Sequence, residues 1–220
     1  MPTQTEPARS NTQQRAGARP EVSTSAPSVI ASARFLGQFI RRPGMIGAVA
    51  PSSAALAHRM VDGVDLHAAR AVVEFGPGTG VFTREIVRRL GPSTRFFSVE
   101  LNPELVARCR AAMPGVEFVA GSAAEVDSMC AQRGIAQLDV VVSGLPWASF
   151  PEGLQDAILS SMLRVLRPGG VFVTFAYGVG TWLPAGRRFY SKLNRLFAAT
   201  HKSKYVWRNL PPAFVYRCVK

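Results

Sequence analysis

The sequence predicts an α/β fold, in which a mainly parallel sheet is covered by helices on both faces. From residue 71 to residue 176, short apolar segments alternate regularly with segments of helical pattern. The short segments are apolar on both faces, which is typical of strands buried between two helical layers. After Gly178 the rhythm ends, and a basic segment with several aromatic residues follows.

The elements of this alternation are expected from local signals. Pro103 stands where proline favours the first turn of a helix. The run Arg167-Pro168-Gly169-Gly170 is expected to end the longest helix. Helices are expected at residues 81–90, 103–113, 123–133 and 151–166. Strands are expected at residues 71–75, 95–99, 116–120, 138–142, 171–176, 205–209 and 213–218, which makes a seven-stranded sheet.

The chain of 220 residues is long enough for one α/β domain with a full hydrophobic core. Residues 1–28 are polar and rich in Ser, Thr, Gln, Ala and Pro, so we expect a disordered tail there. Residues 29–62 are expected to form two helices, and residues 63–220 the α/β domain. There is no apolar run of about 18 residues or more, and no apolar signal segment, so neither a membrane span nor secretion is predicted.

Cysteine usage indicates the compartment. Cys109, Cys130 and Cys218 are far apart and lack the CxxC spacing of zinc sites. The pattern predicts neither a disulfide framework nor a metal site. It is typical of a reducing, cytoplasmic environment.

The segment from Val29 to Ile40 has an amphipathic helical pattern. Its apolar stripe is flanked by Arg34, Arg41 and Arg42. Such a helix either lies on an anionic membrane surface or packs on the core with its arginines in water, and the two alternatives are compatible. A second short helix is expected to run to about Val61, with Ser52 or Ser53 as its N-cap.

The positive charge is concentrated near the end of the chain. The formal net charge is +12, and the last acidic residue is Asp156. Eleven lysines and arginines lie in the final 64 residues. A field of this sign attracts polyanions, which means either nucleic acid or an anionic membrane surface.

A glycine-rich loop follows the first expected strand, with the spacing Gly76-x-Gly78-x-Gly80. Such a loop lets the backbone approach a ligand closely. A dinucleotide fingerprint would place its third glycine one residue later. Glu74 directly before the loop suits a cationic ligand better than a pyrophosphate. Glu100, at the end of the second strand, is placed to accept hydrogen bonds from the two hydroxyls of a ribose.

These residues resemble the cofactor site of the class I methyltransferases, which have a Rossmann-like fold and use S-adenosylmethionine. The stretch Val73 to Gly80 looks like their motif I, and Val99 to Asn102 resembles their ribose-binding strand end. Ser122 stands where these enzymes usually have Asp near the adenine. The resemblance implies a cofactor site made of Ser53, Glu74, Gly76, Pro77, Gly78, Thr79, Gly80, Glu100, Leu101, Ser122, Ala123, Ser143, Gly144 and Leu145.

The stretch Ser143-Gly144-Leu145-Pro146-Trp147 resembles the loop that holds the acceptor in N-methyltransferases. Adenine methylases have Asn or Asp at the first position, because an amide or carboxylate holds a planar exocyclic amine. Ser143 therefore disfavours adenine as the acceptor. Trp147 either faces the acceptor or is an ordinary core aromatic residue.

From about residue 34 to the end, the chain is similar to bacterial phosphatidylethanolamine N-methyltransferases. The stretches that carry this resemblance are residues 35–39, 47–53, 143–147 and 206–213. It implies stepwise methylation of phosphatidylethanolamine towards phosphatidylcholine, by an enzyme that lies on the inner face of the cell membrane. The amphipathic N-terminal helix would dock on anionic membrane and shape the active-site entrance. No stable protein partner is implied.

Several side chains are candidates for the acceptor side of the reaction. Ser143 and Tyr177, at the tips of two strands, are expected to orient the amine or relay its proton. Arg187, Arg188 and Tyr190 are candidates for binding the lipid phosphate, or are plain membrane-facing charge. His201 is either another base or a surface residue.

Two other functions stay open on the sequence. An rRNA adenine dimethylase would explain the positive charge and the Leu-Pro-aromatic loop, and it alone would bind nucleic acid. Ser143 and the lack of an additional C-terminal helical domain disfavour it. A binding protein with an inert core is disfavoured because the glycine loop and Glu100 form a complete cofactor motif.

Overall fold

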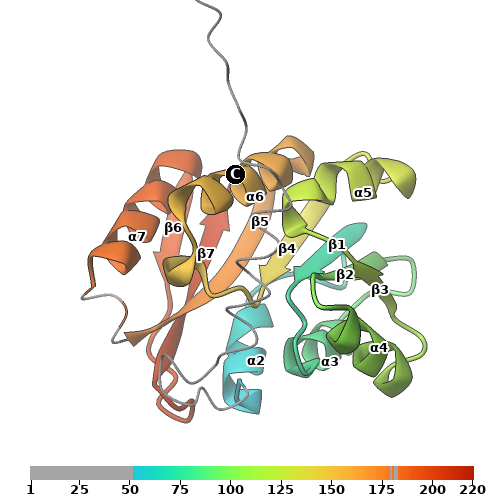
Figure 1. Cartoon of the computed structure of the whole chain (residues 1–220), viewed down its shortest axis with the longest axis horizontal. Helices are drawn as coiled ribbons and strands as arrows, with labels where there is room; N and C mark the ends of the chain where they lie inside the picture. The colour runs from blue at the N-terminus through green and yellow to red at the C-terminus, as the bar shows by residue number, and fades with distance from the viewer. Residues whose placement is uncertain (1–51, 179, 181–182) are drawn as a thin grey trace, which may run out of the picture.

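The computed structural model describes residues 52–178, 180 and 183–220, and within them it shows a seven-stranded sheet (Figure 1). The predicted tail and the amphipathic helix before residue 41 lie outside the described residues. The strand order is β3-β2-β1-β4-β5-β7-β6. Strands β1 to β5 are parallel and β7 runs antiparallel to both of its neighbours. This confirms the predicted mainly parallel sheet.

The elements have the following bounds. The strands are β1 (Ala71–Phe75), β2 (Arg95–Glu100), β3 (Glu117–Ala120), β4 (Leu138–Ser143), β5 (Leu166–Tyr177), β6 (Ala199–Lys202) and β7 (Ala213–Val219). The α-helices are α2 (Ala54–Val61), α3 (Val81–Val87), α4 (Pro103–Ala112), α5 (Val126–Gln132), α6 (Glu152–Val165) and α7 (Pro184–Leu196). Two 3-10 turns are η2 (Ala123–Glu125) and η3 (Trp147–Ser149).

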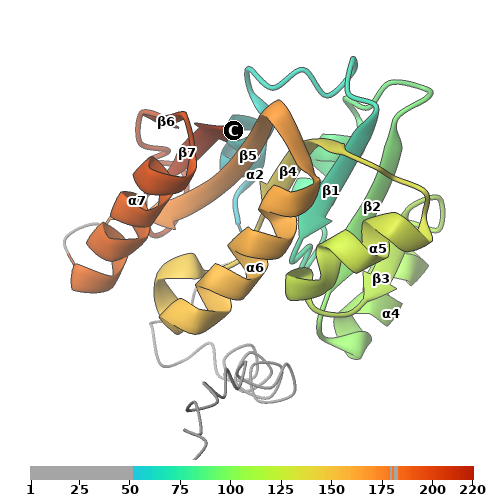
Figure 2. The same cartoon turned by 90° about the horizontal axis from the view of Figure 1, so that it is seen from above.

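Helices cover both faces of the sheet, so each face has its own apolar core (Figure 2). Helices α5, α6 and α7 lie on one face, where their apolar side chains join those of β1, β4 and β5 in the larger core. Helices α2 and α3 pack on the other face, in a core that includes Leu56 and Ile86. The prediction of helices on both faces is confirmed.

The structure corrects the predicted end of the chain. Residues 205–209 do not form a strand; they belong to the connection between β6 and β7, and among them Val206 makes an isolated bridge to Ala213. The strand lies earlier, at β6. This strand is a half-exposed edge strand, so its sequence Ala-Thr-His-Lys is polar and lacks the apolar pattern by which a buried strand is predicted. Helix α7 was not expected, although Phe189 and Leu193 are spaced to bury one helical face.

The expected helix stop at residues 167–170 is also different. These residues are part of β5, which begins directly after α6. The chain end holds them in the sheet, because Gly169 N–H donates to the Lys220 carbonyl and Lys220 N–H donates to the Gly170 carbonyl. Long-range pairing with β7 thus overrides the local turn signal of Pro-Gly-Gly.

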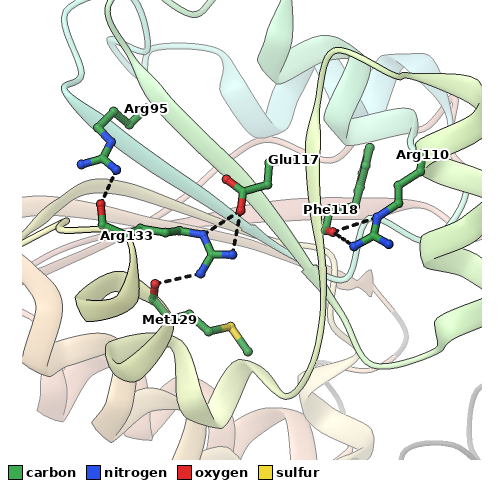
Figure 3. A network of polar contacts seen from close by, with 6 residues as sticks. All are labelled: Arg95, Arg110, Glu117, Phe118, Met129 and Arg133. Atoms are coloured by element: carbon green, nitrogen blue, oxygen red, sulfur yellow. Dashed lines mark hydrogen bonds and ion pairs between the residues drawn. The ribbon is translucent and has the colours of Figure 1, made fainter.

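Arginine side chains cover the exposed edge of the sheet at β3 (Figure 3). Arg110 donates to the carbonyl of Phe118 from Nε and Nη2, at 3.1 and 2.6 Å. Arg133 forms two hydrogen bonds with Glu117, at 2.9 and 2.7 Å, and its guanidinium lies 4.8 Å from the ring centre of Phe97. Arg95 donates to the Arg133 carbonyl. Charged side chains on an edge strand hinder pairing with another chain.

Candidate active site

A cavity of about 160 Å³ opens at the edge of the sheet where the parallel strands end. Its walls come from the loops after β1, β2, β3 and β4 and from α6. The lining residues are Gly76, Gly78, Val99, Glu100, Leu101, Leu105, Gly121, Ser122, Ala123, Gly144, Leu145, Pro146, Leu154 and Ile158. Ligands of open α/β sheets bind at this edge, so the cavity is the candidate active site.

The glycine loop has a conformation that glycine favours. Gly76, Gly78 and Gly80 have φ values of +69°, +54° and +78°. A Cβ on Gly76 would lie 2.8 Å from Leu145 Cδ2, and a Cβ on Gly144 would lie 2.5 Å from the Gly76 carbonyl oxygen. The loops after β1 and β4 therefore touch backbone to backbone, and that contact depends on the missing side chains.

Glu74 is fully buried beneath this loop. Its Oε2 accepts hydrogen bonds from Thr83 Oγ1 at 2.7 Å and from Ser98 Oγ at 2.9 Å. Its Oε1 has no hydrogen-bond partner within the described chain. Burial raises the pKa of Glu74 to about 7, although the two hydroxyls act against it. An acceptor oxygen held without a partner is ready for a cationic donor.

Glu100 lies at the end of β2 and lines the cavity. Its Oε1 accepts the Asn102 N–H at 3.0 Å, and the Gly78 and Leu101 N–H groups also support the carboxylate. Burial raises its pKa despite these donors. The side chain is thereby fixed in one orientation at the position predicted for ribose binding.

Ser143 and Trp147 form a buried pair that stabilises the turn after β4. Trp147 Nε1 donates to Ser143 Oγ at 3.0 Å, and the exposed fractions of the two side chains are 2% and 0%. Trp147 stacks on Phe189 of α7 with a ring-centre distance of 5.2 Å. Trp147 is therefore a core aromatic residue, as one of the two alternatives stated. The Ser143 hydroxyl supports Trp147 here, and its contact with the acceptor amine stays a prediction.

The other predicted residues occupy two kinds of position. Pro77, Thr79 and Gly80 complete the glycine loop without lining the cavity. Ser53 caps α2 by accepting the Leu56 N–H at 3.1 Å, and it too lies outside the lining. Their contacts with the cofactor stay predictions.

The candidates for the acceptor side lie towards β5, β6 and α7. Tyr177 ends β5 and packs edge-on against Phe175. Arg187 is exposed on α7, and Tyr190 on the same helix stacks on Tyr216. His201 is exposed on β6, at the far end of the sheet from β1. None of these four side chains lines the cavity, so their contacts with the acceptor stay predictions.

Sequence reasoning missed the apolar walls of the cavity. Leu105 comes from the first turns of α4, and Leu154 and Ile158 are one helical turn apart on α6. Leucines and isoleucines of this kind look like ordinary core residues in a sequence. The spacing of Leu154 and Ile158 was the available signal, because it places both on the same helix face.

Comparisons with known proteins agree with this geometry. Residues 72–170 match the family model of a methyltransferase domain. An ornithine lipid N-methyltransferase from Singulisphaera acidiphila is 35% identical to this chain over 187 residues, which are 84% of this chain and 93% of that protein. The chain belongs to this bacterial lipid N-methyltransferase family.

Solved structures show that the family member has the class I methyltransferase fold. The O-methyltransferase from Bacillus cereus in complex with SAH has a TM-score of 0.60 at 16% identity, with 90% of this chain and 94% of that chain covered. The O-methyltransferase TomG from Streptomyces achromogenes in complex with SAM has a TM-score of 0.59 at 20% identity, with 86% and 89% covered. The fold of this lipid N-methyltransferase is thus Rossmann-like. The match of residues 72–170 to a methyltransferase domain shows that S-adenosylmethionine is its cofactor.

The residues of the cavity fit this cofactor. Glu100, Ser122 and Ala123, which are the residues predicted for the ribose and the adenine, all line the cavity. The glycine loop allows close approach of the methionine part, and the unpaired Glu74 oxygen below it suits a cation. No three His, Cys, Asp or Glu side chains of the described residues are grouped as a metal site.

Proposed function

We propose that this methyltransferase transfers methyl groups from S-adenosylmethionine to the amine of a membrane lipid. Phosphatidylethanolamine and its methylated intermediates, on the route to phosphatidylcholine, are the acceptors predicted from the sequence. The observation that carries the proposal is the similarity to an ornithine lipid N-methyltransferase over almost the full length of that protein. The two lipids share the chemistry in question, a flexible aliphatic amine.

The loop after β4 supports a flexible amine rather than a planar base. A methylase that acts on adenine needs an amide or carboxylate and an aromatic face that are free to hold the base. Here Ser143 replaces the amide, and Trp147 is buried and already stacked on Phe189. Neither group is available to hold a nucleobase, which disfavours the rRNA alternative.

For methyl transfer, the protein has to position the amine in line with the methyl group and to exclude water from the site. The cofactor supplies an activated methyl group, and the amine nitrogen must meet it in line as a neutral nucleophile. With the cofactor bound, transfer would form the C–N bond as the bond between methyl carbon and sulfur breaks, and the resulting ammonium would release one proton to solvent before the next methylation. Burial raises the pKa of the Tyr177 hydroxyl above its ordinary value, so this side chain is a hydrogen-bonding group and not a base at neutral pH. Its role of orienting the amine is part of the proposal, because Tyr177 ends β5 outside the lining of the cavity.

The proposed location is peripheral, on the inner face of the cell membrane. Among the described residues, no helix has the length and apolar character needed to cross a bilayer. The charge of the last 64 residues supports attraction to anionic lipid, and each basic residue near such a surface contributes about 1 kcal/mol. Arg187 and Tyr190 remain candidates for contacting the lipid phosphate.

A labelling experiment tests the proposal. Purified protein is incubated with methyl-labelled S-adenosylmethionine and one acceptor at a time: phosphatidylethanolamine, ornithine lipid or deproteinised ribosomal RNA. Label in either lipid supports the proposal and identifies the acceptor and the number of methyl groups added. Label in RNA alone would overturn it, while the fold and the cofactor would stand.

A further inference from the structure

Two large apolar side chains project from the loop that joins β6 to β7, called here the 203–212 loop. The exposed fraction of Trp207 is 75% and that of Leu210 is 76%, the highest values among the large apolar side chains of the described residues. Tyr205 lies beside Trp207, with a ring-centre distance of 5.6 Å. Exposing side chains of this size to water is unfavourable, so the patch indicates a partner.

The exposure does not result from a loose loop. Asn209 is 2% exposed; its Oδ1 accepts the Ser53 N–H at 2.9 Å, and its Nδ2 donates to the Pro211 carbonyl at 2.7 Å. Val206 is 8% exposed and is hydrogen-bonded to Ala213 at 2.6 Å. Buried anchors thus alternate with projecting apolar residues, and the loop presents Trp207 and Leu210 in fixed positions.

All charged residues near Trp207 and Leu210 in the sequence are cationic. Lys202, Lys204 and Arg208 are exposed, and none of them forms an ion pair within the part of the chain that the structure describes. The chain has no acidic residue after Asp156. Lys202 lies over the ring of Phe214, with its Nζ 3.9 Å from the ring centre, so Lys204 and Arg208 are the cations left to meet a partner. Apolar side chains flanked by these cations complement an interface that is apolar inside and anionic at its surface.

The 203–212 loop lies at the same edge of the sheet as the cofactor cavity. Ala213, the residue after the loop, pairs with Tyr177, where β5 ends. The cavity opens where the parallel strands β1 to β4 end, and β5 runs parallel to β4. In Figure 1 the loop extends below β7, next to α2, which agrees with the Ser53–Asn209 hydrogen bond.

We propose that the 203–212 loop docks on an anionic bilayer by inserting Trp207 and Leu210 into its interface, with Lys204 and Arg208 at the lipid phosphates. The cavity edge then faces the bilayer from which the lipid amine comes. The inference rests on the proposed function for its choice of a lipid surface. Tryptophan favours the membrane interface because its ring is apolar and its N–H is polar. Leucine offers a nucleic acid neither stacking nor hydrogen bonding, so the pair favours a bilayer over RNA.

The experiment compares the full chain with a Trp207→Ser/Leu210→Ser variant in binding to vesicles. The vesicles contain phosphatidylcholine with or without phosphatidylglycerol, and binding is measured by co-sedimentation. We expect wild type to bind the anionic vesicles, and the variant to bind them at least about 10-fold more weakly because two apolar side chains no longer leave water. A Lys204→Glu/Arg208→Glu variant should also bind the anionic vesicles at least about 10-fold more weakly. This difference from wild type should shrink when salt is added, because salt screens the charges.

Leu196 provides a matched control. It is 41% exposed at the end of α7, and the following strand pairs with the last residue of β7, at the opposite edge of the sheet. Leu196→Ser should leave vesicle binding unchanged. The chain has three tryptophans, so Trp182→Phe leaves only Trp147 and Trp207 as emitters. In this background, the fluorescence of Trp207 should shift to the blue on anionic vesicles and be quenched by brominated lipid. The buried Trp147 should give a constant signal.

Separate readouts distinguish this inference from the proposed function. Methylation of a short-chain lipid amine in detergent micelles, and binding of S-adenosylmethionine by calorimetry, should be the same in the variant and in wild type. Unchanged vesicle binding by the Trp207→Ser/Leu210→Ser variant would overturn the inference, even if lipid is methylated. Loss of vesicle binding without methylation of any lipid would sustain the docking loop and overturn the proposed acceptor.

Discussion

The two halves of the sheet's carboxyl edge are built in different ways. Around β1, β2 and β4, the loops after β1 and β4 touch backbone to backbone, and the polar groups Glu74 and Glu100 are buried. Around β5 and β7 the edge ends in the 203–212 loop, where buried anchors hold large apolar side chains out in water. The first half has the shape of a small-molecule site, and the second has the composition of a surface that meets an extended partner.

The comparison shows that each half contains one energetically unfavourable feature, and that the two features suit different kinds of ligand. In the cofactor half, the unfavourable feature is the buried carboxylate of Glu74, one oxygen of which has no hydrogen-bond partner among the described residues. In the outer half, the unfavourable feature is the apolar surface of Trp207 and Leu210 that is exposed to water. Changes in one half should therefore leave the property of the other half intact, and the following variants test this separation.

The largest expected effect is that of Glu74→Gln on stability. The pKa of Glu74 in the folded protein is about 7, above the ordinary value of 4.5, so the folded state binds more protons between these pH values. The free energy of unfolding of wild type should fall as pH rises through this window, by up to about 3 kcal/mol. Glutamine keeps an acceptor for Thr83 and Ser98 and lacks the charge. The variant should be more stable than wild type at pH 8, and similar at pH 4.

Urea denaturation at pH 4 and pH 8 measures this, with exposed Glu125→Gln as the control. Binding of S-adenosylmethionine should weaken in the Glu74→Gln variant by about 10-fold, because the unpaired carboxylate oxygen is lost. Vesicle binding should not change. A variant that is less stable than wild type at pH 8 would contradict the assignment of Glu74 as a buried, costly carboxylate.

Gly144→Ala should act on the cofactor almost alone. The added Cβ would meet the Gly76 carbonyl oxygen at 2.5 Å, so the glycine loop must move. We expect affinity for S-adenosylmethionine to fall by about 30-fold or more, as for a strain of roughly 2 kcal/mol. Gly153→Ala is the matched control, because its Cβ would meet no atom within 4 Å. Equal calorimetric affinity for both variants would show that the contact between the two loops does not matter.

Ser143→Ala separates a structural role from a role at the amine. Removal of the hydroxyl leaves the buried Trp147 N–H without its partner, which should destabilise the protein by about 1–2 kcal/mol. In a Trp147→Phe background the same change should cost less, since only the longer hydrogen bond from the Leu145 N–H, at 3.3 Å, is then lost. A drop in kcat without a loss of stability would instead support the predicted contact between Ser143 and the amine.

The smallest effect is expected at the β3 edge, away from both halves. Arg110→Ala exposes the carbonyl of Phe118, at a cost of about 0.5–1 kcal/mol. Cofactor affinity and vesicle binding should both stay at wild-type values. Thermal unfolding measures the loss, and Arg108→Ala on the same helix, where the side chain is also exposed, is the control. A change in either binding property would show that this edge contributes to function.

Local patterns in the sequence were sufficient for the polar and glycine positions of the cofactor half, but not for its apolar walls. Glu74 and Glu100 lie in the last residues of β1 and β2, and the glycine loop directly follows β1. Parallel strands bring their carboxyl ends together at one edge of the sheet. The Ser53 N-cap was predictable for the same reason, because a cap depends on a few neighbouring residues. Position along the chain translates into position in the site wherever the alternation of strand and helix is regular.

The outer half depended on contacts that only the tertiary structure shows. The chain terminus converts the Pro-Gly-Gly run into part of β5, and β7 pairs with a polar edge strand instead of residues 205–209. Whether Trp147 faced a ligand or the core depended on Phe189, 42 positions later, and on the fold of α7. The sequence by itself determined the cofactor, because its recognition is local. The tertiary structure decided which aromatic residues are buried and which project, because burial is a property of distant neighbours.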